Sequence, residues 1–263
     1  MAAVAEILEY IETLAPRYMK EDWDRVGLNC GRLDAQVNRV LVALDPFDEA
    51  IAEAREFGAQ LLVTHHALIW EPGFITGADA QGRRALSRIE SGIAPITAHT
   101  NQDLAPGGVN DVLAAKLGLA CTEVIDPAGE DGAGRPYGLL RKGAVPRQPM
   151  AEFLCRVKAA LGCEGLRYVN SGKPVHYVAV GGGACGGGIQ DAFRAGCDTF
   201  VTADLKYTHF REAYDLGMNQ IDAGHFYTEN PVCAVLAEKL AARFPELEVK
   251  VSQNHHDPMK FFC

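Results

Sequence analysis

The sequence predicts an α/β protein made of two similar domains, each a parallel sheet between two layers of helices. Short apolar runs bounded by turn residues recur along the 263 residues and are typical of buried strands. Stretches with apolar residues at helical spacing alternate with these runs. The order strand, helix, strand, helix, strand, helix occurs once in each half, and this alternation is typical of parallel sheets with helices outside.

The first half opens with an amphipathic helix that is expected to end before Pro16. After the first strand, Asp45 is interpreted as a helix N-cap, Pro46 as the first helical residue and Gly58 as the stop. The expected elements are a helix at 4–14, a strand at 39–44, a helix at 46–57, a strand at 61–64, a helix at 84–91, a strand at 94–99 and a helix at 109–117.

The second half repeats this order after one extra helix and one extra strand. The repeat indicates an internal duplication. The expected elements are a helix at 150–161 and a strand at 166–169, then strands at 175–180, 197–202 and 218–223, with helices at 189–193, 210–217 and 230–243.

Residues 127–149 separate the halves and are expected to form a loop or linker, because they are rich in glycine and proline. The predicted domains are therefore residues 1–126 and residues 127–263, with the reservation that the halves can interleave.

Composition points to a cytoplasmic protein without a membrane anchor. Apolar residues make up 48% of the chain, enough for a sizeable core, and no apolar stretch approaches the length of a membrane span. The N-terminus lacks the basic start and apolar segment of a signal peptide. None of the eight cysteines lies in a Cys-x-x-Cys pair, so reduced thiols are expected. The net charge of −9 argues against nucleic acid as a partner.

Histidines and carboxylates gather just after predicted strands, where α/β sheets bind their ligands. The third strand of each half is followed by the same pattern, His-x-x-x-carboxylate. Because imidazole is the commonest side-chain metal ligand, these groups predict a metal site. The groups are His65 with His66, His99 with Asp103, and His225 with Glu229.

The ligand types indicate which metals would bind. Imidazole and carboxylate without thiolate suit zinc, iron, manganese, cobalt or nickel. More than four candidate ligands exceed the needs of one tetrahedral ion, so two divalent ions about 3.5–4 Å apart are expected. A hydroxide bridging two such ions is a nucleophile near neutral pH, which points to hydrolysis.

A glycine-rich segment offers a competing interpretation. Residues 181–186 fit Gly-x-Gly-x-x-Gly between a predicted strand and a helix, and Asp204 ends the following strand. The pattern is open to three explanations: a dinucleotide-binding loop, a backbone nest for a substrate phosphate, or a tight strand-to-helix turn. His255 and His256 form a second histidine pair, interpreted either as a surface turn or as further ligands.

The motifs taken together resemble the Nif-three-like family, also called GTP cyclohydrolase 1 type 2 homologues. The resemblance covers both halves. The matching segments are residues 24–28, 63–69, 98–103, 107–111, 181–183, 202–207 and 222–229, together with Asp257, Pro258, Phe261 and Phe262. Two departures, Ala67 after the histidine pair and Ala203 before Asp204, remove no candidate ligand.

The resemblance implies two α/β domains with a dinuclear metal centre in the cleft between them. It implies a toroidal homohexamer and, because the chain is short, the compact form without an inserted middle domain. His99 matches a histidine beside the site, expected to support the ligands or carry protons. The metal ligands implied are His65, His66, Asp103, His225 and Glu229.

The predicted function is metal-dependent hydrolysis of a small-molecule, nucleotide-like substrate such as GTP, through a metal-bridging hydroxide. A different class of function is also open: a non-enzymatic metal-binding oligomer that carries metal or partners a regulator. A third possibility is binding of a nicotinamide or methyl-donor cofactor by the glycine-rich segment.

Overall fold

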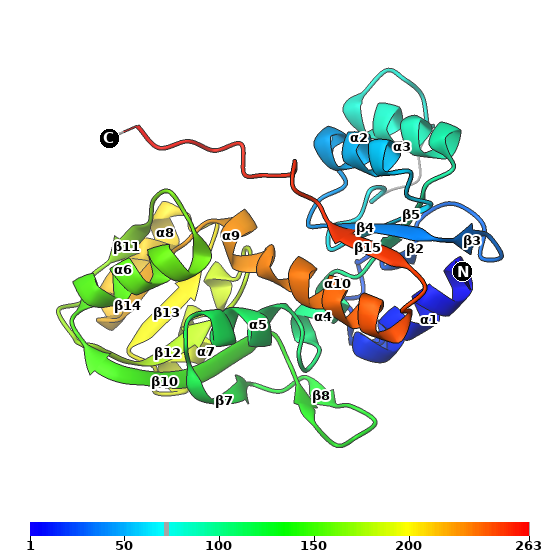
Figure 1. Ribbon diagram of the computed structural model, residues 1–263. Helices are drawn as coiled ribbons and strands as arrows, with labels where there is room; N and C mark the ends of the chain where they lie inside the picture. The colour runs from blue at the N-terminus through cyan, green and yellow to red at the C-terminus, as the bar shows by residue number, and fades with distance from the viewer. Residues whose placement is uncertain (71–73, 263) are drawn as a thin grey trace. The chain divides into compact units, whose positions relative to one another are not determined.

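Parallel strands form the centre of two separate sheets in the computed structural model, which describes residues 1–70 and 74–262 (Figure 1). Unit 1 consists of Met1–Ala105 and Val232–His256, and unit 2 of Pro106–Pro231 and Asp257–Cys263. The protein is thus a mixed α/β fold with two main sheets. The division differs from the expected boundary at residues 126/127, because the chain enters unit 2 near residue 105 and returns to unit 1 near residue 231.

The sheet of unit 1 has the strand order β15-β4-β5-β6-β2. Strands β15, β4, β5 and β6 run parallel, and β2 pairs with β6 in the antiparallel sense. The elements of this unit are β1 (Ala2–Ala3), α1 (Val4–Leu14), η1 (Arg17–Met19), β2 (Gly27–Leu28), β3 (Gln36–Val37), β4 (Arg39–Ala43), α2 (Asp48–Phe57), β5 (Leu61–Thr64), α3 (Ala80–Ser91), β6 (Ala94–Thr97), α4 (Thr100–Leu104), α10 (Pro231–Arg243) and β15 (Glu248–Val251).

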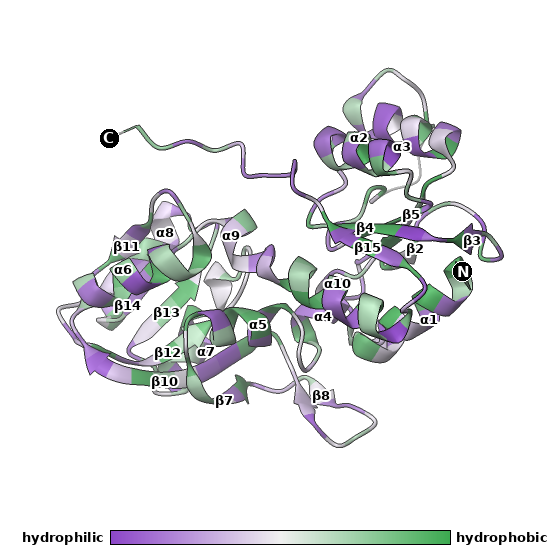
Figure 2. Cartoon of the chain, in the orientation of Figure 1, coloured by the Kyte–Doolittle hydropathy of each residue, from purple (hydrophilic) through white to green (hydrophobic). Residues whose placement is uncertain are grey.

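Alternation along the strands of unit 1 gives the sheet two buried faces. Leu41 and Ala43 of β4 pack with Ile51 of α2, whereas the intervening Val40 and Val42 are buried on the other face. Helices α2 and α3 lie on one side of this sheet, and α1 and α10 on the other (Figure 1). Helix α10 carries both hydrophobic and hydrophilic residues along its length, as an amphipathic covering helix requires (Figure 2).

The sheet of unit 2 has the order β11-β14-β13-β12-β10-β7, with β12, β13 and β14 parallel and the outer strands antiparallel. Helices α5 and α6 pack on one face of the sheet, and α7 and α8 on the other. The elements are α5 (Val109–Lys116), β7 (Ala120–Ile125), β8 (Gly129–Glu130), β9 (Pro136–Tyr137), β10 (Leu140–Gln148), α6 (Met150–Leu161), β11 (Arg167–Val169), β12 (Val175–Val180), η2 (Gly186–Gly188), α7 (Ile189–Arg194), β13 (Thr199–Thr202), α8 (Tyr207–Leu216), β14 (Asn219–Asp222) and α9 (His225–Glu229).

Two local expectations were wrong. The segment 127–149 is not a linker, because it contains the β8–β9 hairpin and the whole of strand β10, which lies within the sheet of unit 2. Helix α2 begins at Asp48 with Phe47 as its N-cap, rather than at Pro46 after Asp45. The carboxylate of Asp45 is instead hydrogen-bonded to His66 and His255.

Membrane-spanning helices and the state of the cysteines were two further points of the sequence analysis. Among the described helices, none is long and apolar enough to cross a membrane. The seven cysteines among the described residues are free thiols, and Cys263 lies outside that part of the chain.

Candidate metal centre

All the histidines proposed for the site follow the carboxyl ends of parallel strands. His65 and His66 come directly after β5, His99 follows β6, and His225 follows β14. His99 caps the single-turn helix α4, and His225 opens the single-turn helix α9. A separation of four residues places the carboxylate on the same side of such a turn, which explains the His-x-x-x-carboxylate pattern in both units.

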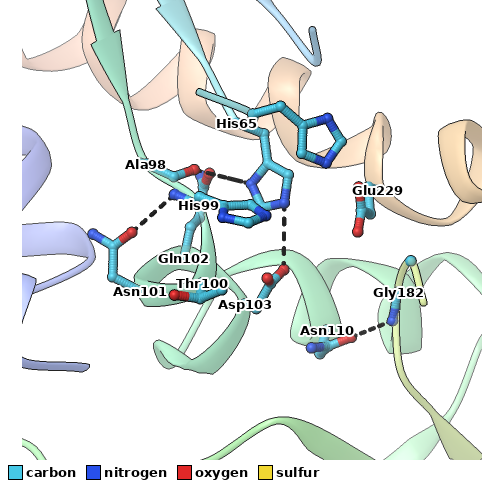
Figure 3. Close-up of polar contacts among 12 residues, drawn as sticks. His65, Ala98, His99, Thr100, Asn101, Gln102, Asp103, Asn110, Gly182 and Glu229 are labelled. Atoms are coloured by element: carbon cyan, nitrogen blue, oxygen red, sulfur yellow. Dashed lines mark hydrogen bonds and ion pairs between the residues drawn. The ribbon is translucent and has the colours of Figure 1, made fainter. Parts of the chain in front are cut away.

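Unit 1 gathers three of its histidines into one cluster, which we call the histidine cluster: His65, His66 and His99. Their rings lie 5.0–5.3 Å apart between centroids, and one ligand atom from each lies within 4.8 Å of the others. Asp103 joins them, with its Oδ1 3.5 Å from Nε2 of His65 (Figure 3). These side chains are buried or nearly so, and the grouping of residues far apart in sequence is what a metal site requires.

Each ring of the histidine cluster is held from behind through its Nδ1 atom. Nδ1 of His66 lies 2.6 Å from Oδ1 of Asp45, and Nδ1 of His99 lies 2.9 Å from Oδ1 of Asp24. Nδ1 of His65 lies 2.9 Å from the carbonyl oxygen of Ala98. Carboxylates at these distances and carbonyls can only accept hydrogen bonds, so all three rings carry their proton on Nδ1.

Unit 2 repeats this arrangement with His225 and Glu229. Nδ1 of His225 lies 2.7 Å from Oδ2 of Asp204, and its Nε2 lies 2.9 Å from Oε2 of Glu229. Asp204 follows β13 and has a φ of +52°, a conformation that non-glycine residues rarely adopt. Glu229 is buried, whereas His225 is one-third exposed.

The four rings therefore share one mode of anchoring, in which Nδ1 of each ring meets an oxygen of the protein. An imidazole whose Nδ1 donates to a carboxylate or carbonyl is the usual form of a histidine that binds a metal through Nε2. The donor set of imidazoles and carboxylates, without thiolates, suits zinc and the neighbouring divalent transition metals. The residues present thus fit divalent metal ions in both units.

Asp45 and Asp24 stay ionised well into the acid range. Burial on its own would raise the pKa of Asp45, but hydrogen bonds from His255 and His66 outweigh it and hold the pKa well below its usual range. Burial likewise acts to raise the pKa of Asp24, and hydrogen bonds from His99 and Thr100 more than offset it. Negative charge behind the rings of His66 and His99 strengthens these imidazoles as ligands.

The glycine-rich segment of unit 2 supports the His225–Glu229 pair. A methyl group at Gly183 would overlap Oε1 of Glu229 and approach Nε2 of His225, and one at Gly182 would crowd Val109 and Glu229. The amide of Gly182 donates to Oδ1 of Asn110 (Figure 3), and the amide of Gly183 donates to Oγ1 of Thr228. Because these amides already have acceptors within the protein, a tight turn against Glu229 explains the segment better than a phosphate nest.

Sequence reasoning missed the three aspartates as supports. The sequence predicts Asp45 as a helix cap and Asp204 as part of a nucleotide fingerprint, and Asp24 enters only as part of a matching motif. A signal was present: Asp45 and Asp204 each stand two residues beyond a parallel strand whose neighbour carries the histidine it supports. His255 also bonds Asp45, through Nε2 at 2.8 Å, so it supports the same carboxylate.

Comparison with known proteins identifies a family for the chain. The family model described as Duf34/NIF3 (NGG1p interacting factor 3) matches residues 2–258. A Clostridium perfringens protein named GTP cyclohydrolase 1 type 2 homolog is 34% identical over 262 residues, covering 97% of this chain and 98% of its own length. A Streptomyces coelicolor protein of the same name is 36% identical over 271 residues, covering 98% and 94%.

Solved structures agree with this similarity. The crystal structure of a Bacillus cereus protein related to NIF3 superposes with a TM-score of 0.94 at 26% identity, covering 100% of this chain and 99% of the other. Reduced HcgD from Methanocaldococcus jannaschii matches with a TM-score of 0.78 at 28% identity, covering 96% and 98%. The relatives named here are matched over nearly their whole length, so the resemblance drawn from the motifs is confirmed.

Proposed function

We infer that this chain, which belongs to the Duf34/NIF3 family, binds two divalent metal ions and uses them for hydrolysis. The observation that carries the proposal is the common state of four histidines. Each is fixed at Nδ1 by an oxygen and presents Nε2 beside other candidate ligands of its own unit. A structural role for one such ring would be ordinary; four rings with the same anchoring favour metal binding.

The proposed ligands come from both units. His65, His66 and Asp103 would be supplied by unit 1, and His225 and Glu229 by unit 2. His99 presents Nε2 in the same way as its two neighbours, so we assign it either a ligand position or transfer of a proton. Asp24 would assist proton transfer by His99 by holding its ring in place through Nδ1.

Bound divalent ions would supply a water nucleophile at neutral pH and would polarise the atom it attacks. The protein's contribution is to fix the ligands before the metal arrives. Asp45, Asp24, Asp204 and the Ala98 carbonyl hold the rings, and the glycine-rich turn limits the positions open to Glu229. Such preorganisation reduces the reorganisation needed during the reaction.

The substrate class follows the name carried by the relatives, GTP cyclohydrolase 1 type 2 homolog, and is proposed as a nucleotide-like molecule. The test is elemental analysis of purified full-length protein, followed by turnover of GTP and a nucleotide panel after reconstitution with zinc, iron, manganese, cobalt or nickel. We expect about two ions per chain and hydrolysis that chelation abolishes. Two bound ions without turnover of any nucleotide would favour the metal-carrier alternative, and failure to bind metal would overturn both.

A further inference from the structure

Two tryptophans lie beside the histidine cluster in unit 1. Trp23 is 59% exposed and Trp70 is 36% exposed, and they are the only tryptophans of the chain. Their ring centroids are 6.0 Å apart, and each meets the ring of His99, at 5.8 and 5.1 Å respectively. The indoles and the histidine cluster therefore form one continuous aromatic surface that includes the candidate metal ligands.

The backbone is anchored on both sides of Trp23 and ahead of Trp70. Asp24, next to Trp23, accepts hydrogen bonds from Thr100 and His99, and the amide of Glu21 donates to Oγ1 of Thr100. The amide of Leu68, two residues before Trp70, donates to Oδ1 of Asn29. Holding a large apolar ring at a fixed exposed position leaves about 2 kcal/mol of burial energy unused, which a ligand can recover.

The surroundings favour a small planar ligand over a protein surface. Lys20, Glu21, Asp22 and Arg25 surround Trp23 in the sequence, and Glu21, Asp22 and Arg25 are exposed. The buried centre of a protein interface is depleted of such charges. A single stacked ring needs only the indole face and tolerates charges at its edge.

We infer that Trp23 and Trp70 form an aromatic wall that binds a planar heteroaromatic ring of the substrate. His99 touches both the wall and the other two histidines, so a ring stacked on the wall has its edge toward the histidine cluster. The chemical class is a nucleobase-like or pyridine-like heterocycle carrying an electrophilic carbon. This assignment rests on the proposed function for the reaction, but ring binding itself requires no metal.

The test uses the fluorescence of tryptophan, excited selectively over that of tyrosine. This signal reports on the wall alone, because the chain has no other tryptophan. Metal-stripped full-length protein is titrated with the monophosphates of guanosine, adenosine and uridine and with nicotinamide mononucleotide. Ribose 5-phosphate serves as the ringless control. We expect saturable, ring-dependent quenching by at least one nucleotide, confirmed by equilibrium dialysis, and no response to ribose 5-phosphate.

Variants locate the binding. Trp23→Ala and Trp70→Ala should each raise the Kd of the best nucleotide about 5- to 100-fold, whereas Trp23→Phe should retain most of the affinity. Tyr18→Ala, an exposed aromatic of the same region, should leave the Kd unchanged. Melting temperature and cobalt stoichiometry, measured on every variant, should stay at wild-type values.

Unchanged affinity in both alanine variants, or equal binding of ribose 5-phosphate, would overturn the aromatic wall. A shift of oligomeric state in the alanine variants without loss of nucleotide binding would assign the tryptophans to a second copy of the chain. Failure of the wall is distinguishable from failure of the proposed function. Two bound metal ions without ring binding would contradict only the wall. Ring binding by a protein that takes up no metal ions on reconstitution would contradict only the hydrolase.

Discussion

Asp45 is the residue whose role differs most from what its sequence position implied. It accepts hydrogen bonds from His66 and His255 and so fixes the ring of a proposed ligand. Asp45→Asn should weaken metal binding about 10- to 100-fold, because the amide cannot supply the negative charge behind His66. Competition with a chromophoric zinc chelator measures this.

The control for Asp45 is Asp48→Asn on helix α2, an exposed carboxylate that pairs with Arg84. It should bind metal as the wild type does. Equal affinities for the Asp45 and Asp48 variants would contradict the proposed support of His66.

Gly183 shows how a glycine can be fixed by its neighbours. Its φ is +63°, and a Cβ there would overlap Oε1 of Glu229. Gly183→Ala should displace Glu229 and lower the metal content, measured by elemental analysis of the reconstituted protein. Gly187→Ala lies in the same turn with nothing near its Cβ and without a positive φ, so it should keep the wild-type content. A loss of metal in both variants would indicate a general effect on the turn.

Arg88 is a buried cation that the proposed function does not use. Within residues 1–70 and 74–262, no group accepts a hydrogen bond from its guanidinium, and burial lowers its pKa to about 10. An unpaired buried charge is costly, so Arg88→Met should raise the free energy of unfolding by about 1–3 kcal/mol. Arg83→Met, exposed on the same helix, should change it little. Urea denaturation measures both, and destabilisation by Arg88→Met would show that the charge is compensated.

At the scale of elements, Glu53 connects helix α2 to the segment that follows β15. Its carboxylate accepts hydrogen bonds from the hydroxyl of Ser252 and the amides of Gln253 and Asn254. Burial acts to raise the pKa of Glu53, but these hydrogen bonds hold it below the ordinary 4.5. The stabilisation is therefore present above pH 4.5 and is lost as the pH falls through the lower pKa of the folded state.

Glu53→Gln should consequently destabilise the protein by about 1 kcal/mol at pH 7 and much less at pH 3. Glu56→Gln, exposed on the same helix, should show no such dependence. The measurement is urea denaturation at several pH values. If the difference in the free energy of unfolding between wild type and Glu53→Gln stays constant with pH, the stabilising role of the Glu53 charge is contradicted.

The sequence was most informative for the inner parallel strands. Strands β4, β5, β6, β12, β13 and β14 were all predicted. The first five are short, largely apolar and mostly buried runs, whereas β14 is buried although three of its four residues are polar. Strand β10 was missed, since it contains Gly143 and Pro146 and pairs in the antiparallel sense with β12 and β7. Strand β15 alternates exposed and partly buried residues at a sheet edge, so tertiary pairing with β4 defines it.

At the scale of the whole molecule, the interleaving of the two units lay beyond the sequence pattern. Helix α10 and strand β15 continue the second half in sequence, yet they complete the sheet and its covering layer in unit 1. The amino-acid pattern of residues 231–251 does not indicate which of the two sheets this segment joins. The role of the candidate ligands stays a prediction, but the gathering of histidine and carboxylate at strand ends was predictable, because parallel strands end at one edge of a sheet. Their supporting aspartates were not, since each has a common alternative as a cap or an ion pair. The toroidal hexamer stays a prediction.

The proposed ligands of unit 1 and those of unit 2 should act together in metal binding. The proposal gives one dinuclear centre ligands from both units, so removing one from each should show coupling. His66→Ala and Glu229→Gln should each weaken cobalt binding, and the double variant should lose less than the sum of the two losses. The shortfall should be about 0.5–3 kcal/mol, the usual range for residues that share one site.

Titration of metal-free wild type, both single variants and the double variant with cobalt, followed by visible absorbance, supplies the four affinities. Asp48→Asn combined with Glu229→Gln is the matched control and should be additive, because Asp48 is an exposed residue of helix α2 paired with Arg84. Additive losses for His66→Ala with Glu229→Gln would mean that each unit binds its own ion. The water nucleophile that two ions supply together would then have no site, and the hydrolytic proposal would fail at its premise.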